Sequence, residues 1–161
     1  MSALSLDTGR ELAVVYVWLE SVLEPDSVLN GLHPGGNMPA DADGIAPGVV
    51  YPAVTWNHQA DAGPGVAYAG GGRAWSYAGL YQVKAITEGE RGVSKAQAID
   101  ARVHALIQGA SNVAVSAPSI GVTGEILWCL KRSTVSYPEV DEAGRRYRHH
   151  GGLYEIAARS S

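Results

Sequence analysis

The chain has 161 residues, of which 46% are hydrophobic, and a formal net charge of −4. A chain of this length fits one domain and buries roughly 70% of the surface that it exposes when unfolded, so residues 1–161 are expected to form a single domain. Its 20 glycines and eight prolines follow no fixed period and lie between patterned segments. This composition favours long loops on a folded domain over a disordered or collagen-like chain.

The charge is divided unevenly along the chain. Residues 1–70 carry one basic residue, Arg10, and eight acidic ones, whereas residues 71–161 carry eleven basic and eight acidic residues. The two parts therefore have net charges of −7 and +3. Two interpretations stay open: opposite charges that let copies of the chain stack or that present a basic face to a polyanion, and an uneven spread of solvated side chains.

The sequence predicts a buried thiol and a soluble protein. Cys129 is the single cysteine, and its neighbours are apolar, so we expect neither an internal disulfide nor a zinc site with several cysteine ligands. The N-terminus lacks a basic start followed by an apolar run, and the longest apolar stretch, Leu12 to Leu19, is too short to span a membrane. We therefore expect a protein that is made in a reducing cytoplasm.

The first third of the chain predicts a helix followed by a long loop. Residues 8–23 form an amphipathic helix in this prediction, and Pro25 ends it, with one further turn over Ser27 to Leu32. Residues Asn30 to Gly48 contain three prolines and five glycines, and loops of this length are usually functional or disordered. The apolar residues that share one face of the helix are Leu12, Val15, Tyr16, Leu19, Val22 and Leu23.

Two strands are predicted next. Val49 to Trp56 is rich in β-branched and aromatic residues, and Pro52 places this strand on an edge or near its own start. A turn over 57–65 and a short strand over 66–68 follow. Residues 74–87 alternate for longer than most strands do.

The glycines Gly70 to Gly72 stand just before that second long strand. A phosphate-binding loop needs a following Lys-Ser or Lys-Thr pair and a helix, and this segment offers neither. We interpret the three glycines as a flexible connection between strands.

The second half of the chain predicts a helix and a β-hairpin. Ser94 and Gln97 make a capping box that opens the helix, and Gly109 ends it. A loop around 111–119 leads to strands over 125–135 and 145–158, which an acidic turn joins. This order of elements predicts an α+β fold in which two helices pack on one face of an antiparallel β-sheet.

No motif for catalysis or metal binding stands out. The sequence has no G-x-S-x-G elbow, and its five histidines show no H-x-x-x-H spacing. His149 and His150 are neighbours on a predicted strand, so they point to opposite faces. Asp41 and Asp43 have a spacing suited to a weak cation site, but no third ligand accompanies them. We expect no catalytic residue, no cofactor and no metal.

The strongest polar cluster lies on the predicted hairpin. Like charges across an antiparallel pair repel unless acidic groups or phosphates lie nearby. Three kinds of partner stay open: the acidic residues of the hairpin turn, the acidic first helix of a neighbouring subunit, and a nucleic-acid backbone bound without regard to sequence. The candidate channel or subunit-interface cluster comprises Lys131, Arg132, Arg145, Arg146 and Arg148.

Over roughly residues 10–158, the order of these features resembles that of a known protein family. A leading amphipathic helix is followed by a Tyr51–Pro52 strand and by an aromatic strand that ends Tyr81-Gln82-Val83-Lys84-Ala85. A capped helix and a final stretch from Tyr147 to Ile156 complete it. This arrangement resembles the tail-terminator family, the tail-to-head joining proteins of long-tailed bacteriophages and related prophages.

The resemblance implies a structural virion protein without enzymatic activity. Family members form a homohexameric ring that caps the tail tube, ends its polymerisation and joins the tail to the head connector. The implied partners are other copies of the chain, the tail tube protein and a head-closure or connector protein. Genomic DNA passes through the channel without sequence-specific binding, and no membrane is involved. The implied location is the neck region of the virion tail, after assembly in the host cytoplasm.

Two alternatives remain beside this hypothesis. In the first alternative the chain is another neck or tail component, such as a head-closure protein or a tail tube subunit. A small ligand-binding or enzymatic domain that uses the Asp41 and Asp43 loop is the alternative from a different class.

Overall fold

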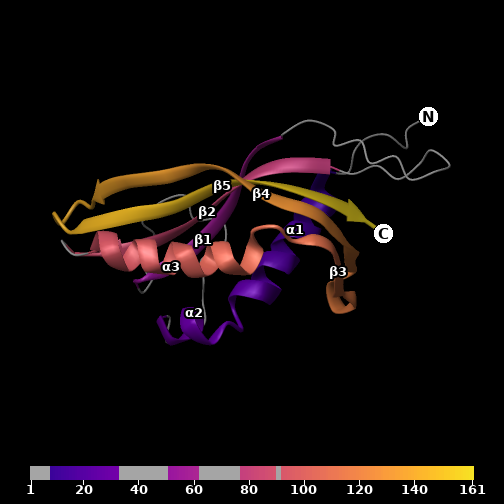
Figure 1. Ribbon diagram of the computed structural model, residues 1–161, viewed down its shortest axis with the longest axis horizontal. Coiled ribbons are helices and arrows are strands. Elements are labelled where there is room, and N and C mark those ends of the chain that lie inside the picture. The colour runs from indigo at the N-terminus through magenta and orange to yellow at the C-terminus, as the bar shows by residue number, and fades with distance from the viewer. Residues whose placement is uncertain (1–7, 33–50, 62–76, 90–91) are drawn as a thin grey trace.

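The computed structural model describes residues 8–32, 51–61, 77–89 and 92–161. The described residues form a curved, five-stranded antiparallel sheet of order β1-β2-β5-β4-β3, with the helices gathered on one face (Figure 1). This is the predicted α+β class. The elements in chain order are α1 (Thr8–Leu23), α2 (Ser27–Leu32), β1 (Ala53–Asp61), β2 (Tyr77–Glu88), α3 (Gly92–Ile107), β3 (Ser111–Ala117), the 3-10 helix η1 (Pro118–Ile120), β4 (Val122–Val140) and β5 (Arg146–Ser160).

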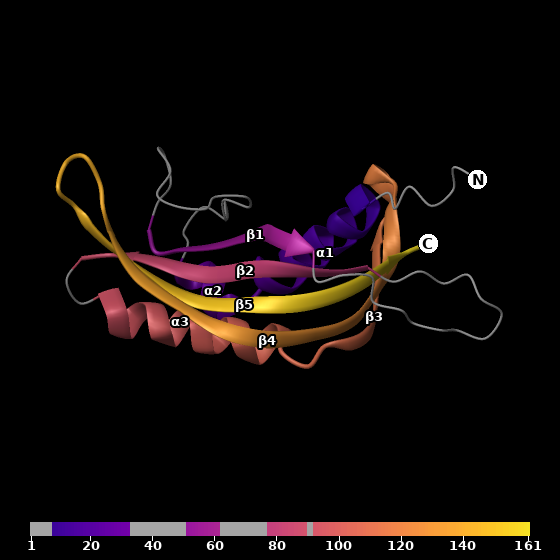
Figure 2. The ribbon, with the colours of Figure 1, turned by 90° about the horizontal axis from the view of Figure 1, so that it is seen from above.

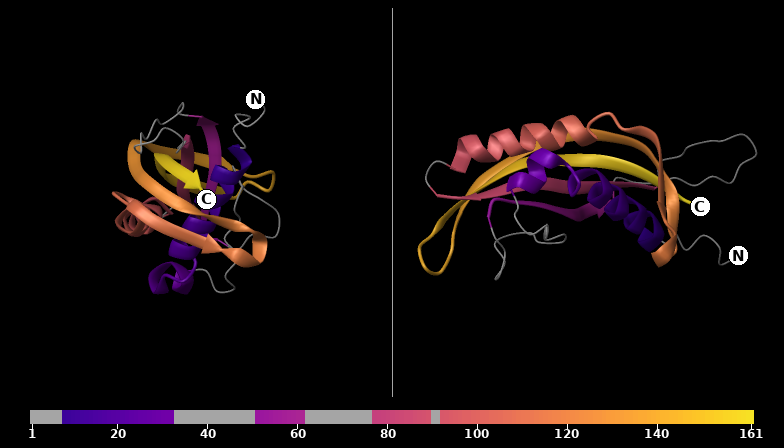
Figure 3. Two further views of the ribbon diagram at one scale, coloured as in Figure 1. Left: turned by 90° about the vertical axis from the view of Figure 1, so that its right-hand side faces the viewer. Right: turned by 90° about the horizontal axis from the view of Figure 1, so that it is seen from below.

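The two faces of the sheet have different neighbours. Residues directly opposite each other in an antiparallel pair share a face, so Trp56, Val83 and Gly152 belong to one row and Thr55, Lys84 and Gly151 to the next. The row with Trp56 lies in the hydrophobic core beneath α1 and α3. Figure 2 looks onto the opposite face, where β1, β2, β5 and β4 lie in front of the helices, and the right panel of Figure 3 looks from the helix side.

Helix α1 has the predicted bounds. Its residues Val15, Leu19 and Leu23 are buried, and the helix packs against β3, β4, β5 and α3. Burying each such side chain contributes about 1.5–3 kcal/mol. Most of the stability of α1 therefore comes from this apolar face rather than from helix propensity.

Helix α2 begins at an aspartate that also binds α3. The Asp26 Oδ1 atom accepts hydrogen bonds from the backbone N–H groups of Val28 and Leu29, both at 3.1 Å. Its carboxylate forms an ion pair with Arg102 at 2.5 Å, and the Asp26 side chain is only 6% exposed. The hydrogen bond from Arg102 is the largest cause of a lowered pKa for Asp26. One side chain thus caps α2 and fixes it to α3.

Replacing Asp26 by alanine is expected to cost about 1 kcal/mol of stability through the lost cap alone. Asp26→Asn keeps a capping oxygen and removes the charge. Because the pKa of Asp26 is lowered in the folded state, its charge stabilises the fold above the unfolded value of about 3.9, and this contribution is lost as the pH falls through the lowered pKa. In urea unfolding measured from pH 7 to pH 2.5, the free energies of unfolding of wild type and Asp26→Asn are expected to become equal only at the acid end. A difference in unfolding free energy that does not change with pH would contradict a stabilising Asp26–Arg102 ion pair.

Three expectations about the strands need correction. The turn predicted over 57–65 is wrong in its first part, because β1 continues to Asp61 across an irregularity between His58 and Ala60. The loop predicted around 111–119 is wrong, because β3 and η1 occupy residues 111–120. The first strand of the hairpin is longer than the predicted 125–135, because β4 spans Val122–Val140 and keeps pairing with β5 as far as Val140.

Several expectations concern residues outside the described part of the chain. These are the loop of Asn30 to Gly48 beyond α2, with Asp41 and Asp43, the short strand over 66–68, and the glycines Gly70 to Gly72. None of the described helices is long and apolar enough to cross a membrane.

Candidate assembly surfaces

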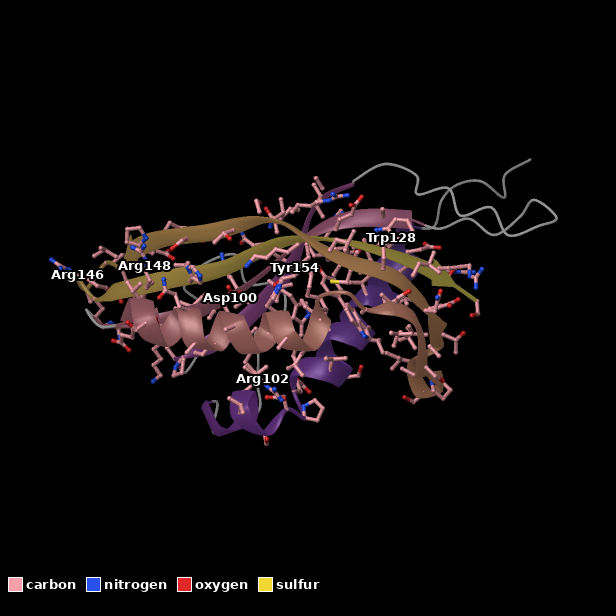
Figure 4. All side chains as sticks on the ribbon, viewed as in Figure 1. Asp100, Arg102, Trp128, Arg146, Arg148 and Tyr154 are labelled. Atoms are coloured by element: carbon pink, nitrogen blue, oxygen red, sulfur yellow. The ribbon has the colours of Figure 1, made fainter. Side chains whose placement is uncertain are left out.

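The five basic residues singled out from the sequence do not form one patch. On the β4–β5 ladder Lys131 pairs with Tyr154, whereas Arg146 pairs with Val140 near the turn. Eight residues of β5 separate these two positions, which is about 26 Å along a strand. Lys131 and Arg132 therefore lie in the middle of the hairpin. Arg146 and Arg148 lie near its tip, where Figure 4 labels them.

Lys131, Arg132 and Arg145 each pair with a carboxylate of the same chain. Lys131 Nζ lies 3.3 Å from Asp100 Oδ2, and Arg132 pairs with Glu155 across the strands. Arg145 Nε lies 2.7 Å from Asp141 Oδ2 in the hairpin turn. For these three residues the structure favours pairing inside the chain.

Asp100 is the functional group that the sequence interpretation missed. It projects from α3 into the space below the hairpin (Figure 4), and its side chain is only 9% exposed. The same carboxylate oxygen that binds Lys131 lies 3.5 Å from His150 Nε2. An aspartate beside Ile99 on the apolar face of a helix was the available signal, because a buried carboxylate needs a cationic or hydrogen-bonding partner.

The space for this polar layer comes from a glycine. A Cβ atom on Gly152 would lie 2.6 Å from Lys131 Cε and 2.9 Å from Tyr154 Cε2. The Lys131 ammonium lies 6.0 Å from the centre of the Tyr154 ring, and the Tyr154 hydroxyl lies 3.2 Å from His104 Nδ1. Burial, followed by the charge of Asp100, raises the pKa of Tyr154. The layer therefore fixes α3 to the hairpin.

His149 and His150 point to opposite faces, as predicted. His150 meets Asp100 on the helix side, while His149 Nε2 lies 2.6 Å from Glu139 Oε2 on the other side. The His149 ring stacks on Tyr137 with centroids 4.3 Å apart. Lys84 Nζ donates a 2.6 Å hydrogen bond to the Tyr137 hydroxyl. The two histidines thus serve two separate clusters.

The face without helices also carries partly exposed apolar side chains. Leu80, Glu155 and Leu130 form one cross-strand row on this face, and Leu130 is 40% exposed. Trp128 is half-buried nearby and is labelled in Figure 4. Partly exposed apolar groups gathered at this part of the sheet face are typical of an assembly surface.

The β4–β5 hairpin ends in a well-defined tip. The Asp141 Oδ1 atom accepts hydrogen bonds from the N–H groups of Ala143 and Arg145 at 2.9 and 2.8 Å. Gly144 has φ +79°, a conformation that glycine adopts without strain. Burial opposes ionisation of Asp141, but the hydrogen bonds from Arg145 keep its pKa below the usual value. Next to this turn, Val140 is 60% exposed.

A groove of about 610 Å³ lies between α1 and the β3–η1 segment. Ile120 at this groove is 67% exposed. Burial, followed by repulsion from Glu20, raises the pKa of Glu24. The groove therefore combines apolar walls with two carboxylates. Its lining includes Val17, Glu20, Glu24, Pro25, Ala117 and Ile120.

Within the described residues, no group of three or more His, Cys, Asp and Glu side chains is arranged to hold a metal ion. Cys129 is buried, as predicted, and burial raises the pKa of its thiol to about 12. The thiol is therefore protonated at neutral pH and is a poor nucleophile.

Comparison with solved structures identifies a structural neighbour of the chain. No family model and no curated protein matches the sequence. The chain is similar to a solved chain described as "Virion of native gene transfer agent (GTA) particle", with a TM-score of 0.57 and 22% identity. The similarity covers 98% of this chain and 99% of that one. At this identity it establishes a shared fold.

Proposed function

We propose that the chain is a structural protein of a phage-like virion and that it acts there as the tail terminator. In this role a homohexameric ring caps the tail tube, ends tube polymerisation and joins the tail to the head connector. The observation that carries the proposal is the end-to-end likeness in fold to a chain of a gene transfer agent virion. Among virion proteins we choose the tail terminator because the order of elements along the sequence resembles that family.

The surfaces of the subunit support a role in assembly. A sheet face with partly exposed apolar side chains, an exposed hairpin tip and an acidic groove are separate surfaces, and a ring subunit uses several surfaces at once. Arg146 and Arg148 near the tip are our candidates for an interface or for the DNA channel. Lys131, Arg132 and Arg145 act first within the subunit, through their acidic partners.

The experiment is removal of the gene from a strain that produces the particles. A missing terminator is expected to give tails of uncontrolled length and filled heads without tails, as seen by electron microscopy, and a plasmid copy restores normal particles. Tails of normal length that fail to attach would instead indicate a head-closure protein. The absence of any tube would indicate a tube subunit. Normal particles would contradict a virion role.

A further inference from the structure

We propose that the β4–β5 hairpin tip of one copy seats in the groove between α1 and β3–η1 of the next copy, so that subunits join head to tail. This inference rests on the proposed ring and names the contact that builds it. The tip is residues 140–148, and the groove is the α1–η1 groove described above.

The two surfaces lie toward opposite ends of the molecule. Strand β4 begins two residues after Ile120, which lines the groove, and it ends at Val140, next to the hairpin turn. Its 19 residues correspond to about 60 Å of strand. Figure 2 shows the hairpin turn extending past α3 at one end, with β3 at the other. A contact between two different surfaces of identical subunits closes into a ring when its rotation permits.

The groove needs a cationic and apolar occupant. Glu20 lies on α1 and Glu24 directly follows it, with its backbone N–H donating to the Glu20 carbonyl oxygen at 3.0 Å, so their side chains are neighbours whose like charges repel. Burial at the groove makes the charge of Glu24 still less favourable. Ile120 and Val17 give the groove apolar surface beside these carboxylates. Positive charge from another chain removes the repulsion, and apolar side chains from the same source cover Ile120.

The hairpin tip has this chemistry. Residues 140–148 contain three arginines and two acidic residues, and the carboxylates of Glu139 on β4 and Glu88 on β2 lie beside them. One of those acids, Asp141, is held inside the turn by Arg145. Val140 adds exposed apolar surface directly beside the turn. Two exposed arginines, Arg145 and Arg146, and an exposed apolar side chain on one projecting turn match the carboxylates and the apolar walls of the groove.

Charge reversal tests the contact. The groove variant is Glu20→Lys with Glu24→Lys, the tip variant is Arg146→Glu, and the control is Lys95→Glu on the exposed side of α3. At about 0.1 M salt each of the first two is expected to need at least about tenfold more protein for half-assembly, because like charges then meet. The control is expected to assemble as wild type does. Light scattering measures the mass of the assembly, and tail tubes are added if the wild-type protein needs them to assemble.

Mixing the groove variant with the tip variant provides the decisive experiment. In a 1:1 mixture the unchanged tip of the groove variant fits the unchanged groove of the tip variant, and the two reversed surfaces also attract each other. Alternating rings are therefore expected from two variants that fail separately. If wild type forms rings but neither variant differs from the control, the hairpin–groove contact is wrong and the ring stands. If wild type forms no assembly alone or with tail tubes, both proposals fail.

A cross-link tests the same contact without a change of charge. A chain with Ile120→Cys and Val140→Cys carries the new thiols at opposite ends of β4, and its native Cys129 is buried. Mild oxidation of assembled protein is expected to give a ladder of covalent multimers on non-reducing gels. Each single variant is expected to give no multimer beyond a dimer. A double variant that stays monomeric on the gel while it forms rings would overturn the contact.

Discussion

Replacing Asp100 by alanine is expected to lower the free energy of unfolding by about 3 kcal/mol. The change removes the carboxylate that Lys131 and His150 share, at 3.3 and 3.5 Å, and it leaves a cationic side chain that is only 20% exposed without this partner. Removing one member of a largely buried pair costs far more than the pair itself contributes. Equilibrium urea unfolding measures the loss.

The neighbouring residue on β4 provides a matched control. Arg132 pairs with Glu155, but its side chain is 55% exposed, so Arg132→Ala is expected to cost less than about 1 kcal/mol. Combining Asp100→Leu with Lys131→Met removes both charges and is expected to recover most of the loss. Equal losses for Asp100→Ala and Arg132→Ala would show that the polar layer beneath the hairpin is not a stabilising feature.

Gly151→Ala is expected to be the most damaging single-methyl change in the sheet. A Cβ atom there would lie 2.3 Å from the Val83 carbonyl oxygen and 2.4 Å from Lys84 Cα, both of which are backbone atoms of the adjacent strand. Strand β5 is central, so the clash is relieved only by moving it away from β2. We expect a loss of about 3 kcal/mol, at the upper end for overpacking, measured as a lower urea midpoint.

Gly152 is the control for this prediction. Its added Cβ would first meet Lys131 Cε, near the flexible end of a long side chain. Gly152→Ala is therefore expected to cost less than Gly151→Ala, since the nearest atoms at Gly152 belong to the side chains of Lys131 and Tyr154, which shift more readily than the backbone of a paired strand. If Gly152→Ala is the more damaging of the two, the close approach of β5 to β2 is not what requires glycine at 151.

The elements that could be predicted from the sequence are those whose signals are local. The apolar period of α1 and the stop at Gly109, where φ is +77°, lie within single segments, and both appear in the structure. The hairpin was also found, since two long alternating runs flank a polar turn. These features depend little on the rest of the chain.

The missed elements depend on partners that are distant in sequence. Strand β3 is a seven-residue edge strand with mostly exposed side chains, and Asn112 within it has φ +52°. It is held by pairing with β4 rather than by its own pattern. The far end of β4 includes Pro138, which reads as a turn signal, yet the pairing with β5 continues through it. Tertiary contacts override local preference at both places.

The candidate surfaces show the same limit. The basic residues of the hairpin were visible as a run of charge, but their division into a central and a tip group follows from strand register. Asp100 and Glu155 bind two of them from other elements, 31 and 23 residues away along the chain. The α1–η1 groove joins residues 17–25 to 116–120, and no pattern in the sequence brings these two segments together.

The most direct test of the central claim is the mass of the purified protein in solution, measured by light scattering at low and moderate salt. We expect a species of six subunits, or a monomer that becomes a ring when tail tubes are added. We also expect weaker assembly at moderate salt, because opposite charges between subunits are then screened. A protein that stays monomeric at both salt concentrations and in the presence of tail tubes would contradict the account.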